Sequence, residues 1–576
     1  MRFWLLCCAL LVSVCGIAQT KKNPFRVDGS IGVSHDYYSL TGNGIDHLKN
    51  RRPEHVTRFQ VYTRFSKGKI SLPFEISFNT QSARVNSSLD GYSSQFSSLS
   101  QLKTADDILR FVSNPVNRIG FTPVLGKFRF RLGTSTPYFS ELVQGSISVF
   151  GAGVDYNGKR MFASVGYGIS QAGFARDTLK GLSGAYRKEQ LSFRLGIGRT
   201  DASFFALNAL VGNDSPVKGL LPDSTVKPEQ GIALSAQWRI QLGRYFFWES
   251  EAAASLYTDN TLGIPFKASD IGLPALPEEL KLSASSRADL AGNGAIGFEL
   301  KGFRLAAKAL YVGAGYKSLG YPFLQSDRME FTISPRLNLL RGDLQVSGSF
   351  GQRVNNLSGT KAAPMEQLIV QSNVSIRFCD WFSFSGGYGN FGTRSGILND
   401  SFRIEQVAQN FQVSPLFNFT GKKAMHTLLF SYNRDDFADL NVLSGKVGNN
   451  QSEIYLASWN RTSLSGIINY GLAYNRFKFT SGFANLFNQS LSLNSSLRLF
   501  KKRLQLSASV GRMANLANPN QTEDQQWVLN AGVDYRSRTG FGIGLRWTNN
   551  NYLYGSARPD SRFNENTLRV SSSWQF

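Results

Sequence analysis

The strongest constraint in this sequence is an alternation of apolar and polar residues that recurs along nearly the whole chain. Within residues 70–79 every second side chain is large and apolar, and the side chains between them are small or polar. Successive side chains of a β-strand point to opposite faces of a sheet, so this pattern predicts a strand with one apolar and one polar face. The same pattern recurs in residues 58–65, 128–132, 191–197 and 504–510.

Two architectures fit such strands, a soluble antiparallel sandwich and a membrane-spanning barrel. A sandwich closes after about 7 to 9 strands, whereas this alternation continues through most of the 576 residues with no linker of distinct composition. A bundle of membrane helices is excluded, because no apolar stretch of about 18 residues remains after the N-terminal segment and the mean hydropathy is −0.20. The sequence therefore favours one barrel, in which only alternate residues face lipid.

The connections between the expected strands support the barrel, because short and long ones alternate. The short turns are expected at residues 66–69, 157–159, 243–244, 341–342 and 539–540, and the long loops at 41–54, 82–116, 171–185, 213–229, 258–285 and 437–450. Outer-membrane barrels have short periplasmic turns and long extracellular loops. We therefore predict an all-β fold, a single large transmembrane antiparallel β-barrel of about 26 strands, with a range of about 22–28.

The barrel is expected to begin near Phe25 and to end at Phe576. With an even number of strands both termini lie at the same end of the barrel. This end also carries the short turns, so both termini are expected in the periplasm. To reach this count, residues 451–475 are interpreted as one long strand rather than two.

The N-terminal residues are typical of a secretory signal peptide. Arg2 supplies the positive start, residues 3–14 form an apolar run, and small residues precede a cleavage site after Ala18. We therefore expect residues 1–18 to be cleaved and residues 19–576 to form the barrel. Lipidation of Cys15 is disfavoured, because Val14 is bulkier than the lipidation signal tolerates.

Cysteine usage agrees with export but offers no structural role. Of the four cysteines, only Cys379 lies beyond the expected signal; the others are Cys7, Cys8 and Cys15. One thiol can form neither an intramolecular disulfide nor a cysteine-rich metal site.

The C-terminus resembles a signal that outer-membrane assembly machinery recognises. Leu568, Val570, Trp574 and Phe576 fall on one face of the last expected strand, with Ser572 as the small exception. A terminal aromatic residue with a second aromatic two positions earlier is typical of this signal. We therefore predict that these four residues direct assembly into the outer membrane.

Two segments carry a family resemblance. Residues 117–123 (NRIGFTP) and 151–160 (GAGVDYNGKR) resemble large, poorly characterised outer-membrane β-barrel proteins of the Bacteroidota, and so does the end of the signal at residues 17–19. The resemblance implies the barrel fold and the outer membrane of a Gram-negative bacterium. It implies no functional residues.

No constellation in the sequence favours catalysis, so we expect the chain not to be an enzyme. The only histidines are His35, His47, His55 and His426, and the first three have Asp36 and Asp46 nearby. Their spacing matches no known metal site, so solvated loop residues are the favoured interpretation. The pairs at 106–107 and 435–436 are adjacent acidic residues that point apart on a strand and make poor acid/base partners. No nucleotide-binding glycine pattern precedes a helix, so no cofactor or metal is predicted.

The positive charge of the chain, 63 Lys and Arg against 40 Asp and Glu, bears on its partners. No basic helix or RNA-binding module is present, so nucleic acid is not expected. Several arginines lie on the strand face opposite the apolar one: Arg58, Arg64, Arg129, Arg131 and Arg194. A midplane arginine facing lipid would cost about 2–4 kcal/mol, so these side chains belong in the lumen or near the rim.

The luminal arginines have two interpretations. The favoured one is a polar lumen in which they pair with Asp and Glu across strands. The other is a positive interior that favours anions. External basic residues could also bind the phosphates of lipopolysaccharide, which together with membrane lipid is an expected partner.

Two functions follow from the sequence. The first is a porin-like conduit for small solutes, and the second is a non-conducting structural, assembly or translocon component. A barrel of about 26 strands leaves a wide hole. In the second function the chain's own loops or a partner protein would plug that hole.

The longest expected loop, 82–116, contains a candidate plug. Leu99, Leu102, Ile108, Leu109 and Val112 recur at helical spacings. A short helix of this kind seldom persists without packing, so its apolar stripe needs a surface. The two candidate surfaces are the inner wall of the barrel, which we favour, and a separate partner protein.

Overall fold

The computed structural model describes residues 25–43, 45, 52–81, 111, 117–145, 147–173, 184–216, 226–265, 280–397, 399, 401, 403–516, 524–555 and 562–576. Almost all of these residues are in strands. The two short helical elements with described bounds are the 3-10 turn η5 (Leu340–Gly342) and the helix α4 (Gly445–Gly448). No helix within these ranges is long and apolar enough to cross a membrane.

The strands form one antiparallel sheet that closes on itself. Those of the first part are β1 (Arg26–Gly42), β2 (His55–Lys67), β3 (Ile70–Gln81), β4 (Arg118–Phe121), β5 (Val124–Leu125), β6 (Phe128–Ser135), β7 (Val149–Asn157), β8 (Met161–Gln171), β9 (Arg187–Gly198), β10 (Phe204–Ser215), β11 (Gln230–Leu242), β12 (Phe246–Thr258), β13 (Ser286–Leu300) and β14 (Phe303–Val312). Those of the second part are β15 (Arg328–Leu339), β16 (Leu344–Asn355), β17 (Met365–Cys379), β18 (Phe382–Ser395), β19 (Glu405–Thr420), β20 (Ala424–Asp439), β21 (Asn450–Ser463), β22 (Ile468–Ser481), β23 (Asn485–Leu499), β24 (Leu504–Leu516), β25 (Asp524–Arg536), β26 (Phe541–Leu553) and β27 (Arg562–Gln575).

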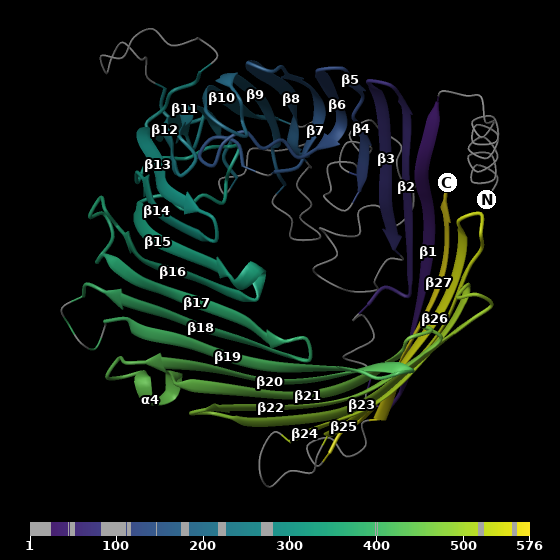
Figure 1. The fold of residues 1–576 in the computed structure, drawn as a ribbon. Coiled ribbons are helices and arrows are strands. Elements are labelled where there is room, and N and C mark those ends of the chain that lie inside the picture. The colour runs from purple at the N-terminus through teal and green to yellow at the C-terminus, as the bar shows by residue number, and fades with distance from the viewer. Residues whose placement is uncertain are drawn as a thin grey trace.

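The barrel has 26 wall strands, because β4 and β5 are two pieces of one strand. Both lie between β3 and β6, and they are separated only at residues 122–123. Pro123 lies in this gap and Pro73 lies opposite it on β3, and neither has an N–H group to donate to the ladder. The closing pair is β1 with β27, which lie side by side (Figure 1), with Asp36 opposite Arg569. The predicted fold class and strand number are therefore confirmed.

The predicted alternation sorts side chains between the two faces of the wall. On β10, Phe205 and Leu207 point outward and are 42% and 49% exposed, whereas Ala206 between them and Leu210 further along point inward and are 0% and 1% exposed. The same outward exposure of large apolar side chains recurs around the barrel. A soluble protein rarely exposes a continuous apolar surface of this extent, whereas lipid would cover it.

Aromatic side chains mark both ends of the outer wall. Near the short turns, Trp381 stacks on Phe417 with ring centroids 6.3 Å apart, and Trp459 stacks on His426 at 5.9 Å. Toward the loops, the rings of Tyr432 and Tyr455 lie 4.8 Å apart on adjacent strands. Two such bands are the expected anchors at the membrane interfaces.

The connections alternate as predicted between two ends of the barrel. At one end, twelve turns of two to five residues join the strands, and at the other end lie the loops. The interpretation of residues 451–475 as one strand is wrong. A turn at residues 464–467 separates β21 from β22, where Gly466 adopts a φ of 66° and its N–H donates to the carbonyl of Ser463. The alternation resumes on both sides of this turn, which hides the break in the sequence.

Candidate functional site

Two loops fold into the barrel and pack against its inner wall. Residues 136–148 join β6 to β7, and residues 313–327 join β14 to β15. We call residues 136–145 and 313–327 the luminal loop pair. In Figure 1 parts of these loops, coloured blue and teal, lie inside the ring of strands near β10 to β13. Neither loop was among those expected from the sequence.

The luminal loop pair forms the main apolar core of the molecule. Leu142 and Val143 from one loop and Tyr316 and Leu319 from the other are buried together. They pack against inward-facing side chains of the wall, namely Leu210, Ala233, Ala253, Tyr257, Ala291 and Val312. Burying each large apolar side chain contributes roughly 1.5–3 kcal/mol, so this core holds both loops to the wall.

Hydrogen bonds join the two loops to each other. The Tyr316 hydroxyl donates to the carbonyl of Leu142 at 3.1 Å, and Ser318 Oγ donates to the carbonyl of Val143 at 2.6 Å. Burial raises the pKa of Tyr316, with a further contribution from nearby Glu251, so its hydroxyl stays a donor. At Gly320 the loops touch so closely that a Cβ would lie 2.4 Å from the carbonyl oxygen of Val143.

Ser140 connects the first loop to the wall. Its hydroxyl donates to Glu251 on β12 and accepts the backbone N–H groups of Leu142 and Val143 at 3.0 and 2.8 Å. Glu251 is only 2% exposed. Burying a carboxylate without partners is costly, so Ser140 both fixes the loop and supplies a hydrogen bond to one oxygen of Glu251.

A charged network connects the second loop to the wall. Lys317 Nζ lies 3.0 Å from Glu229, and Lys188 Nζ lies 2.7 Å from the other oxygen of the same carboxylate and 3.1 Å from Asp214. Burial by itself raises the pKa of Glu229, but the hydrogen bonds and charges of Lys188 and Lys317 outweigh burial and bring the pKa to about 2. The carboxylate of Glu229 therefore stays ionised between two ammonium groups from different elements.

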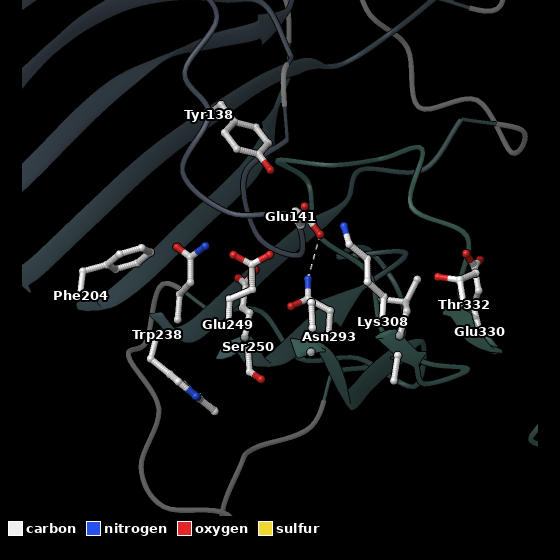
Figure 2. Close-up of a pocket in the computed structure, with 16 residues that line it drawn as sticks. Tyr138, Glu141, Phe204, Trp238, Glu249, Ser250, Asn293, Lys308, Glu330 and Thr332 are labelled. Atoms are coloured by element: carbon white, nitrogen blue, oxygen red, sulfur yellow. Dashed lines mark hydrogen bonds between the residues drawn. The ribbon is translucent and has the colours of Figure 1, made fainter. Parts of the chain in front are cut away.

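A polar cavity of about 310 Å³ lies between the first loop and the wall. Figure 2 shows Glu141 directed toward Asn293, whose side-chain amide donates to it at 3.1 Å, with Lys308 beside them. Glu249 and Glu330 also line this cavity and are paired with Arg239 and Arg353 at 3.7 and 2.7 Å. The arrangement offers charged and amide groups to a polar solute.

The structure places the arginines singled out in the sequence on the polar face of their strands. Arg58 and Arg64 lie 2.6 Å from Asp36 and Asp28, and Arg131 lies 3.0 Å from Asp155. The other two have no such ion pair among the described residues. Arg194 lies over the ring of Phe162 at 5.0 Å and donates to Gln237, and Arg129 is opposite Asp155 in the strand register.

The expected assembly residues lie on the strand that closes the barrel. Leu568 and Val570 are exposed on the outer face of β27. The rings of Trp574 and Phe576 are 5.0 Å apart, and the Trp574 indole donates to the carbonyl of Thr539 in the last turn. Their role in recognition stays a prediction.

The candidate plug residues Leu99, Leu102, Ile108, Leu109 and Val112 lie outside the described residues. Phe111, next to them in sequence, is described, and its ring lies 6.2 Å from Phe78 on β3. Phe78 lies on the apolar face of β3, together with Phe74 and Ile76. The plug hypothesis for this loop stays a prediction.

The histidines do not gather into a described metal site. His35 and His55 stack with ring centroids 5.4 Å apart, and His35 Nδ1 lies 2.8 Å from Thr57 Oγ1. His47 lies outside the described residues. Within the described ranges no group of three or more His, Cys, Asp or Glu side chains could hold a metal ion. Asp435 contacts Asn410 while Asp436 pairs with Arg434 on the opposite face.

A signal for the luminal loop pair was present in the sequence. Connections at the surface are usually polar, yet residues 142–143 and 316–319 place large apolar side chains within connections. Such residues need a surface to cover them. Glu251 gives no comparable signal, because a glutamate on a polar strand face is expected in any barrel of this kind.

Comparisons with known proteins identify no family. No protein-family model matches the sequence, and no curated protein matches it. Similar solved structures include Pseudomonas aeruginosa OccK5 (OpdH), which is 14% identical with a TM-score of 0.30 over 68% of this chain and 98% of that one. Acinetobacter baumannii OccAB4 is 11% identical with a TM-score of 0.29, over 68% and 98%. Pseudomonas aeruginosa OpdK, solved with vanillate, is 10% identical with a TM-score of 0.30, over 68% and 98%.

Proposed function

We propose that this chain is a porin-like conduit for small solutes across the outer membrane of a Gram-negative bacterium. The observation that carries the proposal is the closed wall with an apolar outer face and a polar inner face, against which two loops are held by their own contacts. A wall of this kind satisfies every backbone group within a membrane and leaves its polar face toward an enclosed space.

The width of the barrel gives the luminal loop pair a role. With strands about 4.8 Å apart and tilted by about 40°, 26 strands enclose roughly 50 Å between opposite backbones. A hole of that width would defeat a permeability barrier. Loops held against one side of the wall narrow the path, and the charged cavity beside Glu141 lies where a passing solute would contact them.

The orientation follows from the connections. We place the twelve short turns and both termini in the periplasm and the loops outside the cell. The aromatic residues of β27 serve the assembly machinery, and lipopolysaccharide contacts the outer wall at the loop end. A conduit of this kind needs no catalytic residue, cofactor or nucleic acid.

A preference for anions is the finer part of the proposal. The basic excess of the chain supports it, while the ion pairs of Arg58, Arg64 and Arg131 reduce the free charge that these three residues contribute. The second candidate function is a non-conducting structural or assembly component. The luminal loop pair supports this second function, because loops packed inside the barrel, alone or with a partner protein bound to them, would block the lumen.

Conductance of the purified protein in a planar bilayer tests the proposal. We expect discrete single-channel steps, and in a salt gradient a reversal potential whose sign reports anion preference. A folded, heat-modifiable protein without conductance would exclude the conduit and leave the structural role. A conducting protein with cation preference would exclude only the anion preference.

Deleting residues 95–113 should raise the conductance if the longest loop contributes to the plug.

A further inference from the structure

A second cavity lies at the opposite end of the barrel from the loops. It has a volume of about 390 Å³ and lies along the inner face of β23 to β27, next to the turns. Asp534, Gly544 and Ser571 lie in register on three neighbouring strands of its wall. We call it the turn-end pocket.

The turn-end pocket is strongly basic. Its lining includes Arg498, Lys502, Arg503, Arg536 and Arg546, and its only carboxylate is Asp534. Arg546 lies 3.4 Å from Asp534, and Arg498 donates to Gln505 at 3.2 Å. Within the described part of the chain, Lys502, Arg503 and Arg536 form no ion pair. Like charges gathered in one pocket repel each other, and a bound anion would relieve that repulsion.

The wall of the pocket is built from small residues. Gly542, Gly544, Ser571 and Ser573 line it. A Cβ on Gly544 would lie 2.6 Å from an Asp534 oxygen and 2.7 Å from Ser571 Oγ, so a larger residue there would displace these two side chains. The result is a floor that carries hydroxyl groups and is surrounded by cations. Hydroxyl, guanidinium and ammonium donors are the groups that bind phosphate oxygens.

The turn that supplies two of these cations has an unusual backbone. Phe500, Lys501 and Lys502 have φ angles of 49°, 59° and 67°, which non-glycine residues seldom adopt. Backbone strain of this kind persists where the surrounding structure imposes it, and it clusters at binding sites. Arg503 lies in the same turn, and its carbonyl accepts the N–H of Arg536, the last residue of β25. The turn therefore places its two cations, Lys502 and Arg503, in one pocket with Arg536.

The surroundings of the pocket extend its positive charge. The twelve turns, all of them described, contain fourteen lysines and arginines and only three acidic residues. The basic residues are Lys69, Lys127, Lys159, Arg160, Arg199, Arg244, Lys301, Arg341, Lys422, Lys423, Lys501, Lys502, Arg503 and Arg538. A ring of one charge sign raises the local concentration of ions of the opposite sign. The turn-end pocket is the place in this ring where cations converge on a cavity.

We propose that the turn-end pocket binds an anion rich in phosphate-type oxygens, either free phosphate or the phosphate group of a small solute. This deepens the proposed function, because it names a solute class for the same barrel. The pocket lies beside the turns, so an anion held there would occupy the mouth opposite the loops.

Binding of inorganic pyrophosphate to the full-length protein in detergent tests the proposal by calorimetry, without any need for conduction. The test variant is Lys502→Gln/Arg503→Gln/Arg536→Gln, which removes cations that form no described ion pair. The matched control is Lys422→Gln/Lys423→Gln, which removes two cations from another turn. We expect pyrophosphate affinity to fall about tenfold or more in the test variant and to change less than about twofold in the control. Heat-modifiability on gels verifies that both variants fold.

Three outcomes would overturn the proposal. One is wild-type protein that does not bind pyrophosphate, and another is a test variant that folds and binds as the wild type does. The third is an equal loss in both variants, which would assign binding to the whole ring of charge rather than to the pocket. A protein that binds pyrophosphate but does not conduct would uphold the pocket and contradict the conduit, so the two failures are distinguishable.

Discussion

Two parts of the same wall treat their inward charges in opposite ways. At β10 to β14, which we call the covered wall, the luminal loop pair packs against the inner face, and Glu251 and Asp214 on these strands are buried. At β23 to β27, which we call the uncovered wall, no described loop packs against the inner face. Arg546 and Asp534 there keep 63% and 36% of their side chains exposed.

The comparison shows what a covering loop requires of the side chains beneath it. Under the loops Glu229 lies between Lys188 and Lys317, and Glu251 accepts a hydrogen bond from Ser140. An unpaired charge there would lose its hydration without compensation. On the uncovered wall water solvates the cations, so several can stay unpaired. One region therefore holds its charges in fixed contacts, whereas the other leaves its cations exposed to the lumen.

The largest effect is expected from breaking the apolar core of the covered wall. In Leu142→Asp a carboxylate replaces a side chain that is 1% exposed and packs against both the wall and the second loop. Burying this charge unpaired should cost about 3–5 kcal/mol, so the loops should leave the wall. We expect faster proteolysis within 136–145 and a higher single-channel conductance.

The matched control for this prediction is Leu443→Asp, which alters an exposed leucine in the loop between β20 and β21. It should leave both proteolysis and conductance unchanged. If Leu142→Asp also left both unchanged in a folded barrel, the packed core would not be what holds the loops.

A smaller effect is expected from acid, through Glu229. The pKa of Glu229, about 2, lies below the value of about 4.3 for a free glutamate. The contact between Glu229 and Lys317 therefore stabilises the folded loop fully only above about pH 4.3. As the pH falls from about 4.5 toward 2, the carboxylate gains a proton and up to about 3 kcal/mol of this stabilisation is lost. Protection of residues 313–327 from proteolysis by an acid-active protease should decrease across this window.

The variant Glu229→Gln separates this group from others that titrate in acid. It should show weaker protection of the second loop at neutral pH and a flatter profile between pH 4.5 and 2. A variant with the wild-type profile would show that another carboxyl group controls the acid response.

The fold was predictable because it depends on local patterns. The alternation in β3 and β10 and the glycine turns at residues 68 and 243 determine strand faces and connections without long-range information. The misread segment at 464–467 is instructive, since a turn of four residues with one glycine differs little from a strand that carries a glycine. Local sequence patterns therefore predict the order and faces of the strands well, but they predict the position of an individual turn less well.

The candidate sites were harder to predict because they depend on contacts between residues distant in sequence. Ser140 meets Glu251 and Tyr316 meets Leu142 only after the wall closes. The turn-end pocket joins Arg498 on β23 to Ser573 on β27 in the same way. The arginine side chains could be assigned to the polar face from the sequence, but their acidic partners could not, because partners depend on strand register.

The smallest effect is expected from removing a cation of the uncovered wall. Comparing it with a loop-covered arginine tests directly whether covering determines the cost. Arg498 has one described polar side-chain partner, Gln505, and faces a pocket of like charges. Arg498→Gln should therefore change the free energy of unfolding by less than about 0.5 kcal/mol, as for solvated surface residues. Arg131 lies on β6, outside the covered wall, but the first loop covers it too, since its guanidinium lies 5.5 Å from the centroid of the Phe139 ring. Its side chain is only 10% exposed beside Asp155, so Arg131→Gln should destabilise the barrel more, because it leaves a buried carboxylate unpaired. Urea unfolding of both variants in the same detergent measures the difference. Equal costs at the two positions would show that covering by loops does not determine how this barrel treats its inward charges.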